Sequence, residues 1–513
     1  MLGNSAGVRG SFRDSLEIRF DSRRAYLGEA PKKEYDNRMA MNHGKMKKKL
    51  PFRLAALGIP ERFFPVVRSC VLQLEEDGVP GKAQRRLFGR LAEEPQSFKD
   101  HPVLGDLAAM LCGESARRTS VNNAAAPGAS ASARAPVPWC SWGRGLDPKA
   151  VEQMADGCSL PVAVRGALMP DAHVGYGLPI GGVLAVDNAV IPYGVGMDIA
   201  CRMKMSVFSV SAQLVQSHAD ELARAIEEET CFGVGGRFKE RKDHPVMRED
   251  WGFSPVTRRM QDTAWAQLGT SGSGNHFVEW GVLDVPQDMR GLAAGVYLAL
   301  LSHSGSRGTG GEVAKHYSAL ARRLRPELPR SLGHLAWLGL DTDEGREYWA
   351  AMELMGRYSA ANHALIHAAV AGHLGLAPLV SIENHHNFAW RETHDGREVI
   401  VHRKGATPAG RGVLGVIPGT MVDPAYVVEG LGNPQALCSA AHGAGRAMSR
   451  QEALKRFRRK DLEHVLRELG VRLLSGGLDE VPMAYKDIRA VMAAQADLVR
   501  VCGIFQPRIV KMA

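Results

Sequence analysis

The chain has 513 residues, of which 45% are hydrophobic, and 64 basic side chains against 55 acidic ones give a formal net charge of +9. This length allows several domains, or one large domain with an appendage, and the basic surplus is compatible with a polyanionic partner without requiring one. The longest apolar run, 292–301, is too short to span a bilayer, so we expect no membrane association. Eight cysteines without a CxxC pair argue against a disulfide framework and a zinc ribbon, and we expect a cytoplasmic location.

Two stretches near the N-terminus lack the apolar side chains that a core requires. Residues 1–49 are predicted to be disordered, and their lysine cluster at 45–49 is interpreted as a solvated segment. A later methionine, such as Met39, is an alternative start of the protein. Residues 115–138 contain almost no bulky apolar side chain and are predicted to form a flexible linker. The remainder, 139–513, contains all the chemically informative motifs.

Helical spacing is found between these two stretches, in residues 50–114. Val67, Val71 and Leu74 lie at i, i+4 and i+7, which places them on one face of a helix. We therefore predict a small helical unit in this region.

After the linker, short apolar runs alternate with glycine-rich corners, and reactive side chains recur where the runs end. In VIPYGVGMDIACRM, Asp198 and Cys201 precede an alternating strand pattern at 202–210. A carboxylate and a thiolate three residues apart can bind one divalent ion, and a thiolate can bridge two. The alternative is a buried cysteine beside a capping aspartate.

Three further corners place histidines in the same kind of position. Asn275 and His276 follow two glycines, and another apolar run stops at His303. His385 and His386 are adjacent, and neighbouring side chains of an extended segment point to opposite faces, so only one of them can join a given site. Together with the Asp and the Cys, three histidines at strand ends suit manganese, zinc or iron.

The segment CSAAHGAGRAMSR places His442 before Gly443 and Gly445. Glycines allow backbone N–H groups to approach phosphate oxygens closely, which suits a nucleophilic or phosphate-contacting histidine. Ser449 and Glu452 have the spacing of a capping box, so a helix is predicted to begin after this loop. A purely structural histidine in a glycine-rich turn is the alternative.

Motifs along the chain resemble those of the RtcB family of RNA-splicing ligases, in that family's order. They are PDAHVGYGLPIGG at 170–182, VGMDIAC at 195–201, GNHFVEW at 274–280, HSGSRGTG at 303–310, HHN at 385–387, HRKGAT at 402–407, IPGTM at 417–421, HGAGRAMSR at 442–450 and AYKDI at 484–488. The resemblance covers the chain from about Trp139 to the end. It implies an α/β (α+β) fold, with a single RtcB-like catalytic domain of mixed β-sheets flanked by helices, after a small helical or disordered N-terminal region.

The resemblance implies an RNA ligase that depends on GTP and manganese. Such an enzyme joins a 2′,3′-cyclic phosphate or 3′-phosphate RNA end to a 5′-hydroxyl end, in tRNA splicing or RNA repair, through a guanylylated histidine and an RNA-ppG intermediate. Here the histidine would be His442, with two Mn(II) ions per active site, GTP as co-substrate and an archease-type activator as a candidate partner. The alternatives are a metal-dependent cyclic phosphoesterase and an RNA-end-binding protein without ligation.

The family's site residues are transferred by motif. The implied metal ligands are Asp198, Cys201, His276, His303 and His386, with Cys201 as the bridge. The implied nucleotide contacts are Asn275, His276, Phe277, Val278, Glu279, His386, Asn387, Pro418, Gly419, Thr420, Met421, His442, Gly443, Ala444, Gly445 and Lys511. Candidate phosphate contacts from the residue chemistry are Arg307, Arg403, Lys404 and Arg446.

Three positions depart from the family's pattern. Ala425 replaces a serine hydroxyl that would contact the nucleotide, Thr420 replaces a serine but keeps the hydroxyl, and Arg202 replaces a commoner glycine beside the metal ligands. One lost hydrogen bond costs about 1 kcal/mol when the partner finds water, so we expect GTP binding to be weakened rather than abolished.

Overall fold

The structure is a computed structural model that describes residues 136–513 without a gap, together with positions scattered between 67 and 108. The chain divides into two units, Met1–Ser130 and Ala131–Ala513. The predicted disorder of 1–49 and most of the predicted linker lie outside the described residues, so both stay predictions.

The N-terminal unit contains a small apolar core. Val67 and Val71, which the sequence places on one helix face, are helical and almost completely buried. They form one cluster with Phe88 and Leu91 of helix α3 (Gly81–Glu93). The helical spacing in this segment therefore corresponds to a packed face.

Two main sheets build the larger unit. The first has five strands in the order β1 (Trp139–Ser141), β2 (Ala163–His173), β3 (Ile180–Val186), β11 (Arg397–Lys404) and β10 (Phe388–His394). Only the first two of these strands run parallel to each other. The sheet is therefore mixed, as expected.

The second sheet has eight strands, one of them paired beside the main path. Its order is β13 (Leu414–Ile417), β14 (Ala425–Gly430), β17 (Val499–Met512), β6 (Phe277–Val285), β7 (Gly295–Ser304), β5 (Arg202–Ser211) and β9 (Pro378–His385), with β16 (Arg472–Ser475) paired to β17. The Asn384 amide of β9 accepts from Val416 N at 2.8 Å and donates to Val416 O at 3.2 Å. These bonds connect the two end strands β9 and β13, so the sheet curves round on itself.

Short strand pairs and helices complete the larger unit. The pairs are β4 (Ala189–Val190) with β8 (Leu338–Gly339) and β12 (Ala406–Pro408) with β15 (Ser439–Ala441). The helices are α5 (Pro148–Cys158), α6 (Pro192–Val195), α7 (Leu214–Ser217), α8 (Ala219–Glu229), α9 (Pro255–Gln267), α10 (Arg307–Leu324), α11 (Asp343–His373), α12 (Arg450–Arg456), α13 (Arg459–Leu469) and α14 (Ile488–Ala493).

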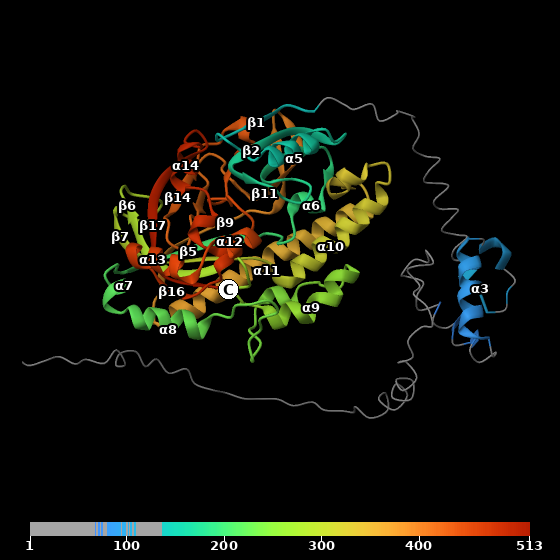
Figure 1. The fold of residues 1–513 in the computed structure, drawn as a ribbon, viewed down its shortest axis with the longest axis horizontal. Coiled ribbons are helices and arrows are strands. Elements are labelled where there is room, and N and C mark those ends of the chain that lie inside the picture. Colours follow the sequence, from blue (N-terminus) through green and yellow to red (C-terminus); the bar gives the residue numbers. More distant parts are fainter. Residues whose placement is uncertain are drawn as a thin grey trace, which may run out of the picture. The chain divides into compact units, whose positions relative to one another are not determined.

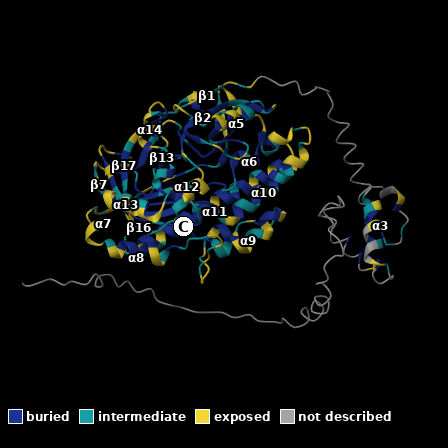
Figure 2. Cartoon of the chain, in the orientation of Figure 1, coloured by how far each residue is buried: buried dark blue, intermediate teal, exposed yellow. Residues whose placement is uncertain are grey.

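Helix α11 is the longest helix of the larger unit and packs against one face of the second sheet. It begins after Thr342, whose side chain accepts from Gly345 N. Two acidic residues follow in its first turn, where their negative charge interacts favourably with the positive end of the helix dipole. The helix packs against α10 and against strands β5 and β7 (Figure 1). Buried residues recur along the whole of α11, and colouring by burial shows α8 and α9 with dark blue and yellow side by side (Figure 2). Mixed sheets flanked by helices confirm the predicted fold class.

Local predictions near the motifs are also confirmed. The alternating pattern at 202–210 is strand β5, and helix α12 begins directly after Ser449, whose side chain accepts from Glu452 N. Among the described residues, no helix combines the length and apolarity that crossing a bilayer requires.

Candidate active site

The candidate metal ligands lie at neighbouring strand ends of the second sheet. Strands β6, β7, β5 and β9 are consecutive in that sheet, and the register places His303 opposite both Phe277 and Met203. His276 directly precedes β6, and His386 directly follows β9. Pairing of the strands therefore brings together side chains that are far apart in the sequence.

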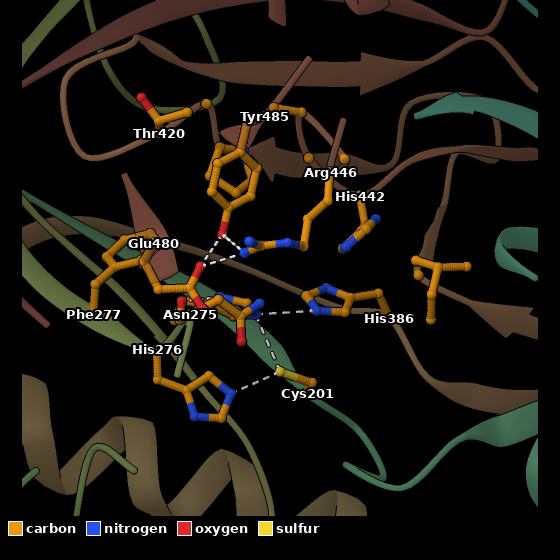
Figure 3. A pocket seen from close by; sticks show the side chains of 18 of the residues that line it. Cys201, Asn275, His276, Phe277, His386, Thr420, His442, Arg446, Glu480 and Tyr485 are labelled. Carbon is orange, nitrogen blue, oxygen red and sulfur yellow. Dashed lines mark hydrogen bonds and ion pairs between the residues drawn. The ribbon is translucent and has the colours of Figure 1, made fainter. Parts of the chain in front are cut away.

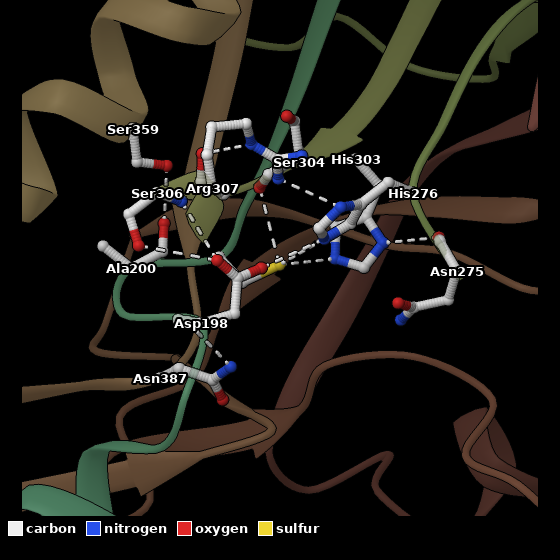
Figure 4. A network of polar contacts seen from close by, with 12 residues as sticks. Asp198, Ala200, Asn275, His276, His303, Ser304, Ser306, Arg307, Ser359 and Asn387 are labelled. Atoms are coloured by element: carbon white, nitrogen blue, oxygen red, sulfur yellow. Dashed lines mark hydrogen bonds and ion pairs between the residues drawn. The ribbon is translucent and has the colours of Figure 1, made fainter. Parts of the chain in front are cut away.

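The five predicted metal ligands form one cluster with two donor groups. One group contains Cys201, His303 and His386, the other contains Asp198, Cys201 and His276, and within each group the donor atoms lie within 4.8 Å of one another. The Cys201 sulfur is 3.3 Å from Nε2 of His276 and 3.1 Å from Nε2 of His303. Because Cys201 belongs to both groups, its position suits a bridging thiolate. Figure 4 shows the side chains of Asp198, His276 and His303 pointing toward one another.

Hydrogen bonds and burial prepare these side chains for a cation. Nδ1 of His303 lies 3.1 Å from Asn275 O, so it carries the proton and leaves the Nε2 lone pair facing Cys201. Burial lowers the pKa values of His303 and His386, which keeps both imidazoles neutral near pH 7. Burial and the Asp198 carboxylate raise the pKa of the Cys201 thiol, so a bound cation would be needed to hold it as thiolate. This donor set fits borderline divalent ions.

Helix α11 holds the backbone that carries these ligands. The Ser359 hydroxyl donates to Ala200 O at 2.8 Å, beside Cys201 (Figure 4). The Asn362 amide donates to Gly305 O at 3.0 Å and accepts from Gly269 N at 2.8 Å. The helix therefore fixes loops on both sides of the cluster.

His442 lies beside the cluster of candidate metal ligands, with its ring centroid 4.8 Å from that of His386 (Figure 3). Its Nδ1 is 2.6 Å from Oδ2 of Asp171, and its backbone N–H donates to the same oxygen at 3.2 Å. Since Asp171 is completely buried on β2, this carboxylate fixes both the ring and its tautomer. Nδ1 carries the proton, and the Nε2 lone pair remains available as a nucleophile.

The loop after His442 is packed tightly against the same aspartate. Gly445 has φ +71°, and a Cβ there would lie 2.1 Å from Asp171 O. Only glycine fits this position without displacing the backbone around Asp171. The glycine-rich sequence thus has a packing reason as well as the predicted closeness to a ligand.

One pocket joins the cluster of candidate metal ligands to His442. It is lined by all five predicted metal ligands and by every predicted nucleotide contact except Val278, Glu279 and Lys511. The pocket is also lined by His173, Ile180, Gly405, Arg446, Arg450, Glu480, Tyr485 and Met512. Figure 3 shows Cys201, His276, His386 and His442 around its centre.

The three exceptions are held elsewhere. Val278 is buried in the apolar cluster on the opposite face of the sheet from Phe277. Lys511 donates to Glu227 O at 3.2 Å and lies over the Phe232 ring. Glu279 is buried on β6, two residues after Phe277. The structure does not bring these three side chains to the pocket lining.

Burial raises the pKa of Glu279 well above its usual value, so the folded protein binds a proton that the unfolded chain releases near pH 4.5. The contribution of this proton to the free energy of unfolding is therefore fully present below the unfolded pKa. It is lost as the pH rises toward the pKa of Glu279 in the folded protein. We therefore expect Glu279→Gln to match the wild type in free energy of unfolding at pH 4.5 and to exceed it at pH 8.5, by about 1.4 kcal/mol for each unit of pKa shift. Urea denaturation at the two pH values measures this. Equal differences at both would contradict a buried neutral carboxyl.

The four candidate phosphate contacts have different surroundings. Arg446 lines the pocket, where it pairs with Glu480 at 2.9 Å. The Arg307 guanidinium lies 3.0 Å from Nδ1 of His276. Arg403 is buried, pairs with Glu392 at 2.6 Å and donates to Leu437 O, so its role is structural.

Lys404 is buried as well, and burial lowers its pKa to about 7. Its ammonium group donates to the carbonyl of Tyr176. The lysine therefore supports a loop beside the pocket and does not line the pocket itself.

The structure describes all three residues that depart from the family's pattern. Ala425 starts strand β14 and is buried. The Thr420 hydroxyl donates to Asp423 at 2.5 Å and points away from the pocket centre in Figure 3. Arg202 pairs with Glu383 at 2.9 Å, outside the donor cluster. The hydroxyl retained at position 420 is therefore bonded to Asp423 and does not face a ligand in the pocket.

Sequence reasoning missed several residues of the site. Asp171 lies within the PDAHVG motif, but no pattern on its own strand indicates a partner 271 positions away. Glu480 accepts from Arg446 and from Tyr485, and Arg450 approaches it to 2.9 Å. The available signal was the presence of Asp171, Arg450 and Tyr485 in the quoted motifs.

Comparison with known proteins matches this arrangement. The family model for tRNA-splicing ligase RtcB matches residues 153–253 and 249–512. The RNA-splicing ligase RtcB of Escherichia coli K12 is 34% identical over 397 residues, which cover 72% of this chain and 95% of the relative. The RNA-splicing ligase RtcB of Mycobacterium bovis is 32% identical, with 68% and 97% covered, and the tRNA-splicing ligase RtcB of Methanococcus maripaludis is 30% identical, with 70% and 89% covered.

A mixed α/β fold with a thiol–imidazole–carboxylate cluster and an oriented histidine in one pocket defines a candidate metal-dependent transferase or ligase site. The chain belongs to the RtcB family of RNA-splicing ligases.

Proposed function

We propose that this protein joins RNA ends in a reaction that uses GTP and manganese. The substrates are an RNA with a 2′,3′-cyclic phosphate or 3′-phosphate end and an RNA with a 5′-hydroxyl end, in tRNA splicing or RNA repair. The supporting observation is the placement of His442, whose Nδ1 is held by Asp171 at 2.6 Å while its ring lies beside His386.

In the first step, Nε2 of His442 attacks the α-phosphorus of GTP. A nitrogen–phosphorus bond forms, the bond to the bridging oxygen of the β-phosphate breaks, and pyrophosphate leaves. Asp171 stabilises the positive charge that develops on the imidazole and keeps the ring aligned. Divalent ions at the cluster would offset the negative charge of the phosphates.

The later steps use the same pocket. Water opens a cyclic end to the 3′-phosphate, and an oxygen of this phosphate then takes GMP from His442, which restores the imidazole. The 5′-hydroxyl oxygen attacks the phosphorus of the 3′ end and loses its proton to water, while the bond from this phosphorus to the oxygen of GMP breaks. GMP departs and a phosphodiester remains. Arg446 and Arg450 on the pocket wall, which both pair with Glu480, are the guanidinium groups that would donate to these phosphates.

Incubation with labelled GTP and Mn(II) tests the proposal directly. We expect covalent label from α-labelled GTP and none from γ-labelled GTP, because only the GMP moiety is transferred. Ligation is then followed with one RNA carrying a 3′-phosphate and another carrying a 5′-hydroxyl. A protein that opens cyclic phosphates without acquiring label would be a phosphoesterase instead.

Asp171→Asn is expected to slow guanylylation about 10²- to 10⁴-fold, because an amide favours the wrong tautomer of His442 and cannot balance its charge. Single-turnover labelling gives the rate, and thermal unfolding shows whether the variant is folded. The matched control is Asp262→Asn, at a side chain that is 82% exposed on α9. A rate for Asp171→Asn within twofold of the control would rule out this role for the carboxylate.

A further inference from the structure

Tyr176 is an exposed aromatic side chain close to the pocket. It is 68% exposed, and among the described residues it is the only Phe, Tyr or Trp with such an exposed side chain. Val174, two residues earlier, is 45% exposed. Burial of an aromatic ring is strongly favourable, so a ring left open to solvent at this place is available to a ligand.

The loop that presents Tyr176 is held firmly. Gly175 on its N-terminal side exchanges two hydrogen bonds with the Gln153 side chain, at 2.6 and 3.0 Å. The Tyr176 carbonyl accepts from the buried Lys404 ammonium group. On the other side, a Cβ at Gly177 would lie 2.9 Å from His334 O, so the backbones are in close contact. A ligand that contacts Tyr176 therefore needs to order little of the backbone.

This loop adjoins the pocket at both ends. His173 and Ile180 line the pocket, and Tyr176 lies between them in the sequence. Three residues span at most about 11 Å, so the Tyr176 Cα is within that distance of the His173 Cα. Bases of a stacked strand are spaced by about 3.4 Å, which places Tyr176 within a few nucleotides of an RNA end held in the pocket.

The surroundings of Tyr176 are aromatic and basic. His334 meets Tyr176 at a centroid distance of 6.0 Å and Tyr193 at 4.7 Å, both edge to face. Burial lowers the pKa of His334, and the nearby cations Arg322 and Lys404 lower it further. Lys404 is buried, so the exposed Arg322 is the cation that a phosphate can reach. Proteins bind single-stranded RNA with aromatic rings beside such cations, through base stacking and phosphate attraction.

We propose that Tyr176 is a stacking platform for an unpaired base of the RNA substrate, next to the end that is held at His442. This inference rests on the proposed function and adds to it a preference for unpaired RNA near the junction. The tyrosine binds substrate and takes no part in the transfer of GMP.

The experiment uses the full chain and two RNA strands with 2-aminopurine near the reacting end, one ending in a 3′-phosphate and the other in a 5′-hydroxyl. Fluorescence anisotropy gives the dissociation constant of each, and 2-aminopurine quenching reports stacking. We expect Tyr176→Ala to weaken binding of at least one strand about 5- to 100-fold and to remove its quenching. Tyr176→Phe should bind within twofold of the wild type, whereas Tyr176→Leu should resemble the alanine variant.

Two controls make the result specific. Leu469→Ala removes a 47% exposed apolar side chain on α13 and should not change RNA affinity. The loss in Tyr176→Ala should be the same at low and high salt, because stacking releases no counterions. Unchanged affinity and quenching in Tyr176→Ala for both strands would overturn the inference. The wild-type labelling assay with GTP alone tests the proposed function separately, since it needs no RNA.

Discussion

His442→Ala is expected to abolish covalent labelling by α-labelled GTP, because it removes the only imidazole of the pocket whose Nδ1 is held by a buried carboxylate. Label should fall below detection, a loss of at least about 10⁴-fold. Denaturing gels after incubation with GTP and Mn(II) measure it. The matched control is His464→Ala, at a side chain that is 66% exposed on α13, which should label like the wild type.

His173 is the alternative nucleophile that the labelling experiment must exclude. It lines the same pocket, and burial lowers its pKa to about 4, so this imidazole is neutral at pH 7. If label persists in His442→Ala and disappears in His173→Ala, then His173 is the nucleophile. The assignment of this role to His442, with Asp171 orienting its ring, would then be wrong. Loss of label in His442→Ala alone supports the assignment.

Cys201→Ala is expected to weaken binding of Mn(II) at both ion positions, because its sulfur belongs to both donor groups. Removing residues that merely support ligands costs 10- to 100-fold in metal affinity, so we expect a loss of at least about 100-fold here. Titration followed by the electron paramagnetic resonance of free Mn(II) measures affinity and stoichiometry without GTP or RNA.

The exposed Cys140 supplies the control for this metal experiment, since Cys140→Ala removes a thiol that belongs to neither donor group of the described residues. Two ions bound with wild-type affinity by Cys201→Ala would refute a bridging role. Loss of one ion and retention of the other would instead assign Cys201 to a single position. Zn(II) titrated in parallel shows whether the thiolate prefers the softer ion.

Much of the site was predictable because its residues lie at strand ends. An apolar run followed by His303, and a glycine corner before His276, are visible in the sequence, and the alternation of an extended segment separates His385 from His386. The structure confirms this separation, since His385 packs on Phe388 and Trp390 while His386 faces the cluster. These features depend on local backbone geometry.

Other features depend on which segments pack together. Arg403 was a candidate for phosphate binding, yet it is buried against Glu392 and Leu437 O. The hydroxyl of Thr420, expected to face the nucleotide, is taken up by Asp423. A guanidinium or hydroxyl has the same chemistry in either setting, so the sequence could not distinguish the two.

The sequence by itself determined the donor types, their places at strand ends and the glycine loop after His442, since these follow from local spacing and from motifs that occur in order. Only the tertiary structure decided that Cys201 is shared by two donor groups and that Asp171 orients His442. It also left Val278, Glu279 and Lys511 outside the pocket lining. The physical reason is that the pairing of distant strands sets the distances between side chains, and no local pattern encodes those distances.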